Sequence, residues 1–149
     1  MPRDDLLKGR FSSPGHVYHV TTCTEARRPL FRDFPCGRLV VKEMQALNNT
    51  ETLTSLAWVI MPDHVHWLFQ LGNDRTLSHA MKGFKASSAL SINRFLNRRD
   101  PVWQRGFYDH ALRREEDLRT VARYIVGNPL RAGLVQHIGD YPLWDAIWL

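Results

Sequence analysis

The chain has 149 residues, 44% of them hydrophobic and 23% charged, which are globular proportions, and its length predicts a single domain over residues 1–149. No apolar run approaches the roughly 20 residues that cross a bilayer, and the first residues lack a signal-peptide pattern, so we expect a cytoplasmic protein. Twenty Lys and Arg against fifteen Asp and Glu give a net charge of +5, which favours phosphate-rich partners.

The first half of the chain alternates between strand and helix patterns. A β-branched and aromatic run at 15–22 predicts a strand, and a basic loop follows it. Apolar residues at helical spacing predict a helix over 36–49. Two further strands are expected at 52–60 and 64–71, joined by a Met-Pro-Asp turn, so this part should form a hairpin.

The second half predicts two helices around one strand. The first helix should run over 76–99 with Thr76 as its cap and with a buried stripe of Leu77, Ala80, Met81, Phe84, Ser88, Ile92 and Phe95. A strand at 103–113 and a helix at 115–129, which ends in Gly-Asn-Pro, come next. The last fourteen residues are assigned only a packing role. This order predicts an α+β fold of the split β-α-β, ferredoxin-like type, with an antiparallel sheet and its helices on one face.

Two histidines lie one residue apart in the strand predicted at 64–71. Because side chains alternate across a strand, His64 and His66 should share one face, while the neighbouring apolar side chains face the helices. The two Cα atoms would be about 7 Å apart, from which two imidazoles can converge on one metal ion. An ordinary half-exposed strand with two polar residues is the alternative, and this short motif leaves both interpretations open.

The helix predicted at 115–129 carries a second polar pair beside its apolar stripe of Leu118, Val121, Ala122 and Ile125. Tyr124 lies at the edge of that stripe and Asn128 follows one turn later, so the phenol and the amide share one strip of surface. Taken singly, a boundary tyrosine that packs its ring and an asparagine that ends the helix explain both residues. Beside a same-face histidine pair, they indicate a shared site.

These residues resemble a known family. His64-Val65-His66 is similar to the HUH motif, in which two histidines flank a hydrophobic residue, and the segment from Tyr124 to Asn128 resembles the nucleophile helix of single-tyrosine HUH transposases. A closer resemblance, over about residues 15–135, is to the REP-associated tyrosine transposases of bacteria. It rests on the stretches YHVTTCTEARRPLF, MPDHVHWLF and WQRGFYDHALRREEDLRTVARYIVGNPLRAGLV.

The resemblance implies an HUH endonuclease type of domain that nicks and joins single-stranded DNA at palindromic repeats folded into hairpins. His64, His66 and Asn128 would be metal ligands, and Tyr124 would be the nucleophile that forms a 5′-phosphotyrosine. Two nitrogens and one oxygen favour Mn²⁺ in affinity, whereas cellular abundance favours Mg²⁺. The repeat-associated group implies a monomer, with a homodimer as the alternative.

DNA contacts should come from basic side chains directed at phosphates. The candidates are Arg27, Arg28, Lys82, Lys85, Arg113, Arg114 and Arg123. Solvated surface charge is the favoured interpretation for any one of them alone, and Arg119 and Arg123 could pair with Glu115 or Glu116 on their own helix. Trp103 and Tyr108 are candidates for stacking on bases, although a packed position is favoured for both.

Two alternatives to a tyrosine nickase stay open: a nuclease that uses water, in which Tyr124 is only structural, and a hairpin-binding protein without catalysis. Zinc deaminases and zinc peptidases are excluded because the sequence contains no C-x-x-C, H-x-E or H-E-x-x-H. Cys23 and Cys36 suit neither a disulfide framework nor a zinc knuckle, so we expect packed, reduced thiols.

Overall fold

The computed structural model describes residues 15–148 and shows a five-stranded antiparallel sheet in the order β4-β1-β3-β2-β5. The strands are β1 (Val17–Cys23), β2 (Leu53–Met61), β3 (His64–Leu71), β4 (Tyr108–Leu112) and β5 (Trp144–Ala146). The predicted α+β class with an antiparallel sheet is confirmed. Most of the amino-terminal segment considered for a signal peptide lies outside the described residues. Strand β3, which carries the two histidines, is central and pairs with β1 and β2.

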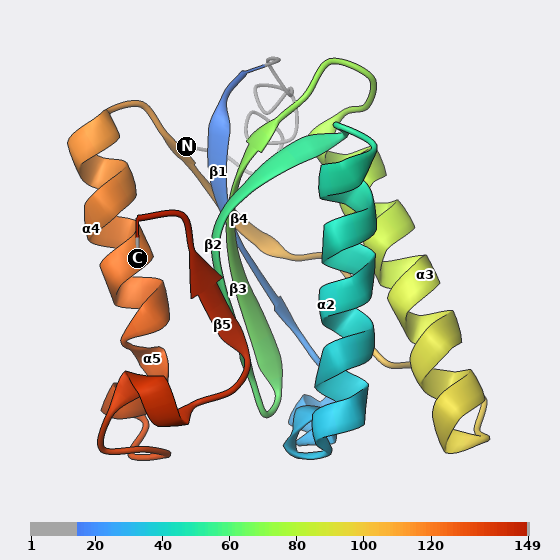
Figure 1. Cartoon of the computed structure of the whole chain (residues 1–149). Coiled ribbons are helices and arrows are strands. Elements are labelled where there is room, and N and C mark those ends of the chain that lie inside the picture. Colours follow the sequence, from blue (N-terminus) through green and yellow to red (C-terminus); the bar gives the residue numbers. More distant parts are fainter. Residues whose placement is uncertain (1–14, 149) are drawn as a thin grey trace.

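Helices cover both faces of this sheet. They are α2 (Phe34–Asn49), α3 (Leu77–Leu96), α4 (Glu115–Val126) and α5 (Asn128–Arg131), and short 3-10 turns occur at Glu25–Arg27, Leu30–Arg32 and Ile138–Asp140. Figure 1 shows α2 and α3 on one side of the sheet, and α4 and α5 on the other. The prediction that the helices lie on one face is therefore wrong.

A second apolar core explains why α4 lies on the far face. Strand β2 presents Ala57, Val59 and Met61 to that face, and α4 buries Ala122 and Ile125 against them. Burial of apolar surface stabilises a fold by about 25 cal/mol per Å² removed from water. Strand β2 is thus apolar on both faces, which requires a helical layer on each side.

The first core lies beneath α2 and α3 and confirms the predicted orientation of β3, because Val65, Trp67 and Phe69 are each at most 1% exposed there. The cap of α3 is confirmed too, since the Thr76 hydroxyl accepts a hydrogen bond from the His79 N–H. The predicted stripe of α3 is buried with one exception. Phe95 is 52% exposed, because it lies in the last turn of the helix, beyond the core.

Turns shorten two of the predicted elements. The strand predicted over 103–113 pairs only at Tyr108–Leu112, because Gly106, with φ of 72°, turns the chain before it. Trp103 instead makes a separate bridge to Thr24. The helix predicted over 76–99 ends at Leu96, where Asn97 adopts a left-handed conformation that caps it.

The carboxyl-terminal third differs from prediction in two ways. The helix predicted over 115–129 ends at Val126, because Pro129 has no N–H to donate to the helix, and the chain restarts as α5. The final segment, given only a packing role, supplies the edge strand β5, whose three residues are too few to show an alternating pattern. The remaining predicted elements agree with the structure to within two residues.

Two smaller predictions concern the cysteines and the membrane. Cys23 and Cys36 are free and buried, as predicted. Within residues 15–148, every helix is too short or too polar to cross a bilayer.

Candidate active site

The paired histidines project from the predicted face of β3. Their ring centroids are 5.0 Å apart and the rings are nearly perpendicular. Register with the neighbouring strands places Thr21 of β1 and Val59 of β2 on either side of His66. The prediction that the two imidazoles share one face is confirmed, and it follows from strand alternation alone.

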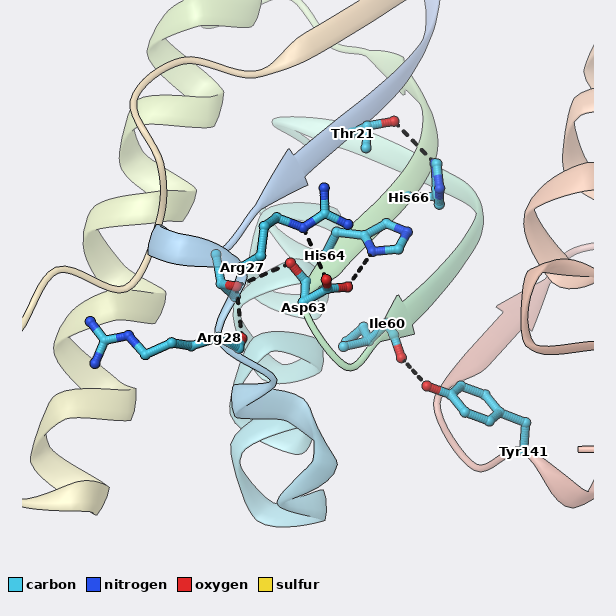
Figure 2. A network of polar contacts seen from close by, with 9 residues as sticks. Thr21, Arg27, Arg28, Ile60, Asp63, His64, His66 and Tyr141 are labelled. Atoms are coloured by element: carbon cyan, nitrogen blue, oxygen red, sulfur yellow. Dashed lines mark hydrogen bonds and ion pairs between the residues drawn. The ribbon is translucent and has the colours of Figure 1, made fainter. Parts of the chain in front are cut away.

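Asp63 determines how the His64 ring is held. Its Oδ1 accepts a hydrogen bond of 2.7 Å from His64 Nδ1, and its Oδ2 accepts one of 2.9 Å from Arg27 Nε (Figure 2). Burial alone would raise the pKa of Asp63, but the hydrogen bonds from His64 and Arg27 hold it below its ordinary value. Since Nδ1 of His64 is engaged by an ionised carboxylate, Nε2 is the ring atom left for a ligand.

His66 is held by β1. Its Nδ1 lies 3.0 Å from Thr21 Oγ1 (Figure 2). The same Nδ1 lies 3.0 Å from His19 Nε2, and either atom can accept the proton that Nδ1 donates. Burial, together with the charges of His64, His19 and Arg131, lowers the pKa of His66 to about 3. Burial, together with His110, lowers the pKa of His19 to about 4. Both rings are therefore neutral at pH 7, as a metal-binding imidazole must be.

Helix α4 brings Tyr124 to the histidine pair. The rings of Tyr124 and His66 meet edge to face with centroids 6.0 Å apart, although the residues are far apart in the sequence. Tyr124 is 50% exposed, so its phenol is accessible from solvent. The structure thus brings together three of the four residues that the sequence grouped.

Arg131 also contacts Tyr124. Its guanidinium carbon lies 4.1 Å from the Tyr124 ring centroid, and its Nη2 donates to the Tyr124 carbonyl near the end of α4. Gly127 makes this reach possible, because a Cβ at that position would come within 2.8 Å of Arg131 Nη1. The Gly-Asn-Pro sequence, predicted only as a helix stop, therefore also makes room for this arginine.

Asn128, the fourth predicted residue, begins α5 and is half buried. Its side-chain nitrogen is buried and, among the described residues, has no hydrogen-bond partner. Such an atom costs about 1–3 kcal/mol when it stays unpaired, and a half-turn of the amide exchanges it with the carbonyl oxygen. Asn128 makes no hydrogen bond to either imidazole.

These donors suit a divalent cation. Nδ1 of each histidine is within hydrogen-bond distance of a neighbouring side chain, and an unpaired amide lies one turn beyond Tyr124. Across residues 15–148, no group of three His, Cys, Asp or Glu side chains could hold a metal ion. The predicted ligand set has only two such side chains, and its third ligand is the amide of Asn128. Two imidazoles with one amide oxygen form an acceptable set for Mn²⁺ or Mg²⁺.

The predicted DNA-contacting residues have different surroundings. Arg27 is bound to Asp63, and Arg28 pairs with Asp100 at 3.8 Å. Lys85 is half buried and donates to the carbonyls of Gln104 and Gly106, so it supports the loop before β4. The exposed members of the set are Arg27, Lys82, Arg113, Arg114 and Arg123. The side chains of Glu115 and Glu116, suggested as partners for Arg119 and Arg123, lie outside the described part. All seven stay predictions as DNA contacts.

The sheet face beside the site is polar and only partly covered. Helix α4 packs on β2, β3 and β5, whereas β1 and β4 present His19, Thr21, Tyr108 and His110 on the same face. Tyr108 is 71% exposed, so a packed position is wrong for it and it remains available for stacking. Trp103 is 7% exposed and donates to Ser88, so a packed position is confirmed.

Four residues near the site were not predicted: Asp63, His19, Thr21 and Arg131. Signals for three of them exist in the sequence. Asp63 directly precedes the histidine motif, and His19 and Thr21 alternate within a β-branched strand. Arg131 follows Tyr124 by two helical turns, but an expected helix stop at Gly-Asn-Pro concealed that relation.

The fold is that of a tyrosine transposase of known structure. A REP-associated tyrosine transposase bound to a REP hairpin matches with a TM-score of 0.74 and 21% identity, over 90% of this chain and 78% of that one. The chain belongs to the IS200-like transposase family, whose sequence profile matches residues 12–128.

Curated relatives point in the same direction. A protein of Escherichia coli (strain K12), named REP-associated tyrosine transposase, is 32% identical over 91 residues, which are 58% of this chain and 50% of that protein. A Haemophilus influenzae protein that carries the same name provisionally is 32% identical over 98 residues, 59% of this chain and 56% of that protein. The chain spans about half the length of these relatives.

Proposed function

We propose that the protein is a metal-dependent endonuclease and strand transferase for single-stranded DNA, acting at REP-type palindromic hairpins through a 5′-phosphotyrosine at Tyr124. The observation that carries the proposal is the contact between Tyr124 and His66, whose ring centroids are 6.0 Å apart. The names of the similar proteins support the substrate class. Because both residues belong to one chain, a monomer suffices as the active unit.

Mg²⁺ or Mn²⁺, held by Nε2 of His64 and His66 and by the Asn128 carbonyl oxygen, would neutralise charge on the scissile phosphate. The chain's own groups do the rest. His64 and His66 are fixed through Nδ1, so their free nitrogens keep one direction during the reaction. Helix α4 places the phenol at the edge of the same site.

The cleavage step is a transesterification. Tyr124 Oη attacks phosphorus and forms a P–Oη bond, while the P–O3′ bond breaks. The phenol proton passes to solvent, which reaches the half-exposed ring, and the departing 3′ oxygen takes a proton from solvent. The phosphodiester energy is retained in the tyrosine link, so another 3′-hydroxyl can reverse the step without ATP.

The test uses a hairpin oligonucleotide labelled at its 3′ end, incubated with Mn²⁺ and separated on a denaturing gel. Wild type should form a protein-linked labelled fragment, and Tyr124→Phe should form at least about 10³-fold less, because the nucleophile is gone. Tyr141→Phe is the matched control, since it also removes one hydroxyl, which donates to the Ile60 carbonyl away from the histidines (Figure 2).

Two outcomes would contradict the proposal in different ways. Cut DNA without a protein-linked fragment, equally in wild type and Tyr124→Phe, would show a nuclease that uses water. Tight hairpin binding with no cut at any metal concentration would show a binding protein without catalysis.

A further inference from the structure

The Asp63 carboxylate joins two side chains from separate parts of the chain. In the turn between β2 and β3 it accepts from His64 Nδ1 at 2.7 Å through one oxygen and from Arg27 Nε at 2.9 Å through the other. Figure 2 shows the Arg27 guanidinium beside the His64 imidazole. A predicted metal ligand and a predicted phosphate contact therefore share one carboxylate.

The loop that carries Arg27 is locked to this turn by main-chain bonds as well. The N–H of Thr24, which is fully buried, donates to the Asp63 carbonyl at 2.9 Å, and its hydroxyl donates to the Arg28 carbonyl at 2.8 Å. Within the loop, Ala26 and Arg27 have φ of 56° and 52°. Two consecutive left-handed residues that are not glycine persist only where their surroundings enforce them, and such outliers concentrate at functional sites.

Arg27 has unused hydrogen-bonding capacity. Its bond to Asp63 occupies Nε, its side chain is 54% exposed, and no partner within residues 15–148 takes its terminal nitrogens. A guanidinium held in this way offers a planar pair of N–H donors, the geometry that suits a phosphate. Arg32, five residues further along the chain, is exposed and is not among the predicted DNA contacts.

We propose that Arg27 is a catalytic residue that binds the scissile phosphate, and that Asp63 is a positioning residue that holds Arg27 and His64 in a fixed relation. The inference rests on the proposed function and deepens it. Asp63 keeps the proton of His64 on Nδ1, which leaves Nε2 free for the metal, and it aims the guanidinium at the same place. A phosphate bound there would meet the cation on one side and Arg27 on the other.

The experiment compares Asp63→Ala, Asp63→Asn, Arg27→Met, Arg27→Lys and the matched control Arg32→Met, each checked for folding by thermal melting. Mn²⁺ binding is measured without DNA, from the loss of the free-ion EPR signal. The rate of the protein-linked fragment is measured in a single turnover with saturating Mn²⁺ and hairpin DNA. Separate readouts are needed because the two residues should affect different steps.

The expected results differ between the two residues. Asp63→Ala should weaken Mn²⁺ binding about 10-fold or more, and Asp63→Asn less, because an amide accepts from only one of the two donors. Arg27→Met should leave the Mn²⁺ dissociation constant within about 2-fold of wild type and lower the saturated rate about 100-fold. Arg27→Lys should recover only a small part of that rate, since lysine lacks the planar fork. Arg32→Met should match wild type in both readouts.

Three results would overturn the inference. Mn²⁺ affinity in Asp63→Ala equal to wild type would remove the positioning role. An Arg27→Met rate that returns to wild type at saturating DNA would make Arg27 a binding contact only. Equal losses in Arg27→Met and Arg32→Met would indicate general surface charge. If wild type itself forms no linked fragment, the proposed function fails, whereas the Mn²⁺ comparison still tests Asp63.

Discussion

The two halves of the site are built in opposite ways. The histidine half belongs to the central strand, where His66 is 9% exposed and its Nδ1 lies within hydrogen-bond distance of Thr21 and His19. The tyrosine half belongs to the end of a helix, where Tyr124 is 50% exposed and is held by ring contacts with His66 and Arg131. Strand register fixes the first half, and a few surface contacts fix the second.

This difference matches the demands of the proposed chemistry. A metal site gains affinity when its ligands are already oriented before the ion arrives. A nucleophile that is linked to DNA and later released needs room for the strand on its open side. Substitutions in the histidine half should therefore weaken metal binding, whereas substitutions in the tyrosine half should impair only the covalent step.

The largest effect is expected from a substitution that removes a side chain of the histidine half. His66→Ala should weaken Mn²⁺ binding at least about 100-fold and abolish the protein-linked fragment, because one of the three proposed ligands is lost. Tyr124→Phe should abolish the fragment equally and leave the Mn²⁺ dissociation constant within about 2-fold of wild type. Isothermal titration of each variant with Mn²⁺ measures this. Parallel losses of metal affinity in both variants would mean that the halves do not separate.

Acid should weaken the histidine half of the metal-free protein. The pKa of His19 is about 4 in the folded chain against 6.5 for a free side chain, so between these values the unfolded chain binds the proton and the folded chain does not. Stability is then fully present above pH 6.5 and is lost as the pH falls toward 4. Each pKa unit corresponds to about 1.4 kcal/mol, so the loss from His19 is on the order of 3 kcal/mol.

Urea unfolding between pH 7 and pH 4, with a chelator present, measures this loss. His19→Gln should flatten the decline, because glutamine can still accept from His66 and does not titrate. His137→Gln, at an exposed position, is the control and should decline as wild type does. Identical declines in His19→Gln and wild type would show that burial of His19 does not set the acid sensitivity.

A smaller effect is expected when the support of the tyrosine half is removed. Arg131→Met should lower the single-turnover rate of the linked fragment about 10-fold, because the Tyr124 ring and carbonyl lose their partner. Gly127→Ala should act in the same direction, since its Cβ would displace the guanidinium. Both should bind Mn²⁺ as wild type does. Arg119→Met, on the exposed part of α4, is the control, and an equal loss there would implicate charge in general.

The histidine half of the site could be predicted from the sequence, whereas the position of the tyrosine half could not. Alternation along β3 was enough to place His64 and His66 on one face, because strand geometry is local. The face that α4 covers was not predictable from its own periodicity. It depends on the second apolar surface of β2, to which Ala57 and Val59 contribute. The contact between Tyr124 and His66 needs that choice of face, so it came from resemblance to a family and not from periodicity.

The supporting residues could not be predicted for a different reason. Asp63 lies in a turn, where an aspartate is expected for its turn chemistry, and only the structure shows its carboxylate between His64 and Arg27. Arg131 reaches Tyr124 across Gly127, and this depends on how α5 restarts after α4. Both contacts cross boundaries between elements, which sequence patterns define least well.

The contrast between held and free side chains recurs on α3, and it gives the smallest expected effect. Lys82 is exposed, whereas Lys85 Nζ donates to the Gln104 and Gly106 carbonyls at 2.5 and 2.6 Å. If Lys82 contacts a phosphate, Lys82→Met should reduce the slope of log affinity against log salt by about 0.7 for a single strand. Lys85→Met should leave that slope unchanged and lower the free energy of unfolding by about 1 kcal/mol, because the loop before β4 loses its support. Fluorescence anisotropy across a salt series measures the slope, and urea unfolding measures the free energy of unfolding. A reduced slope in Lys85→Met without loss of stability would show that this lysine leaves the loop to bind DNA.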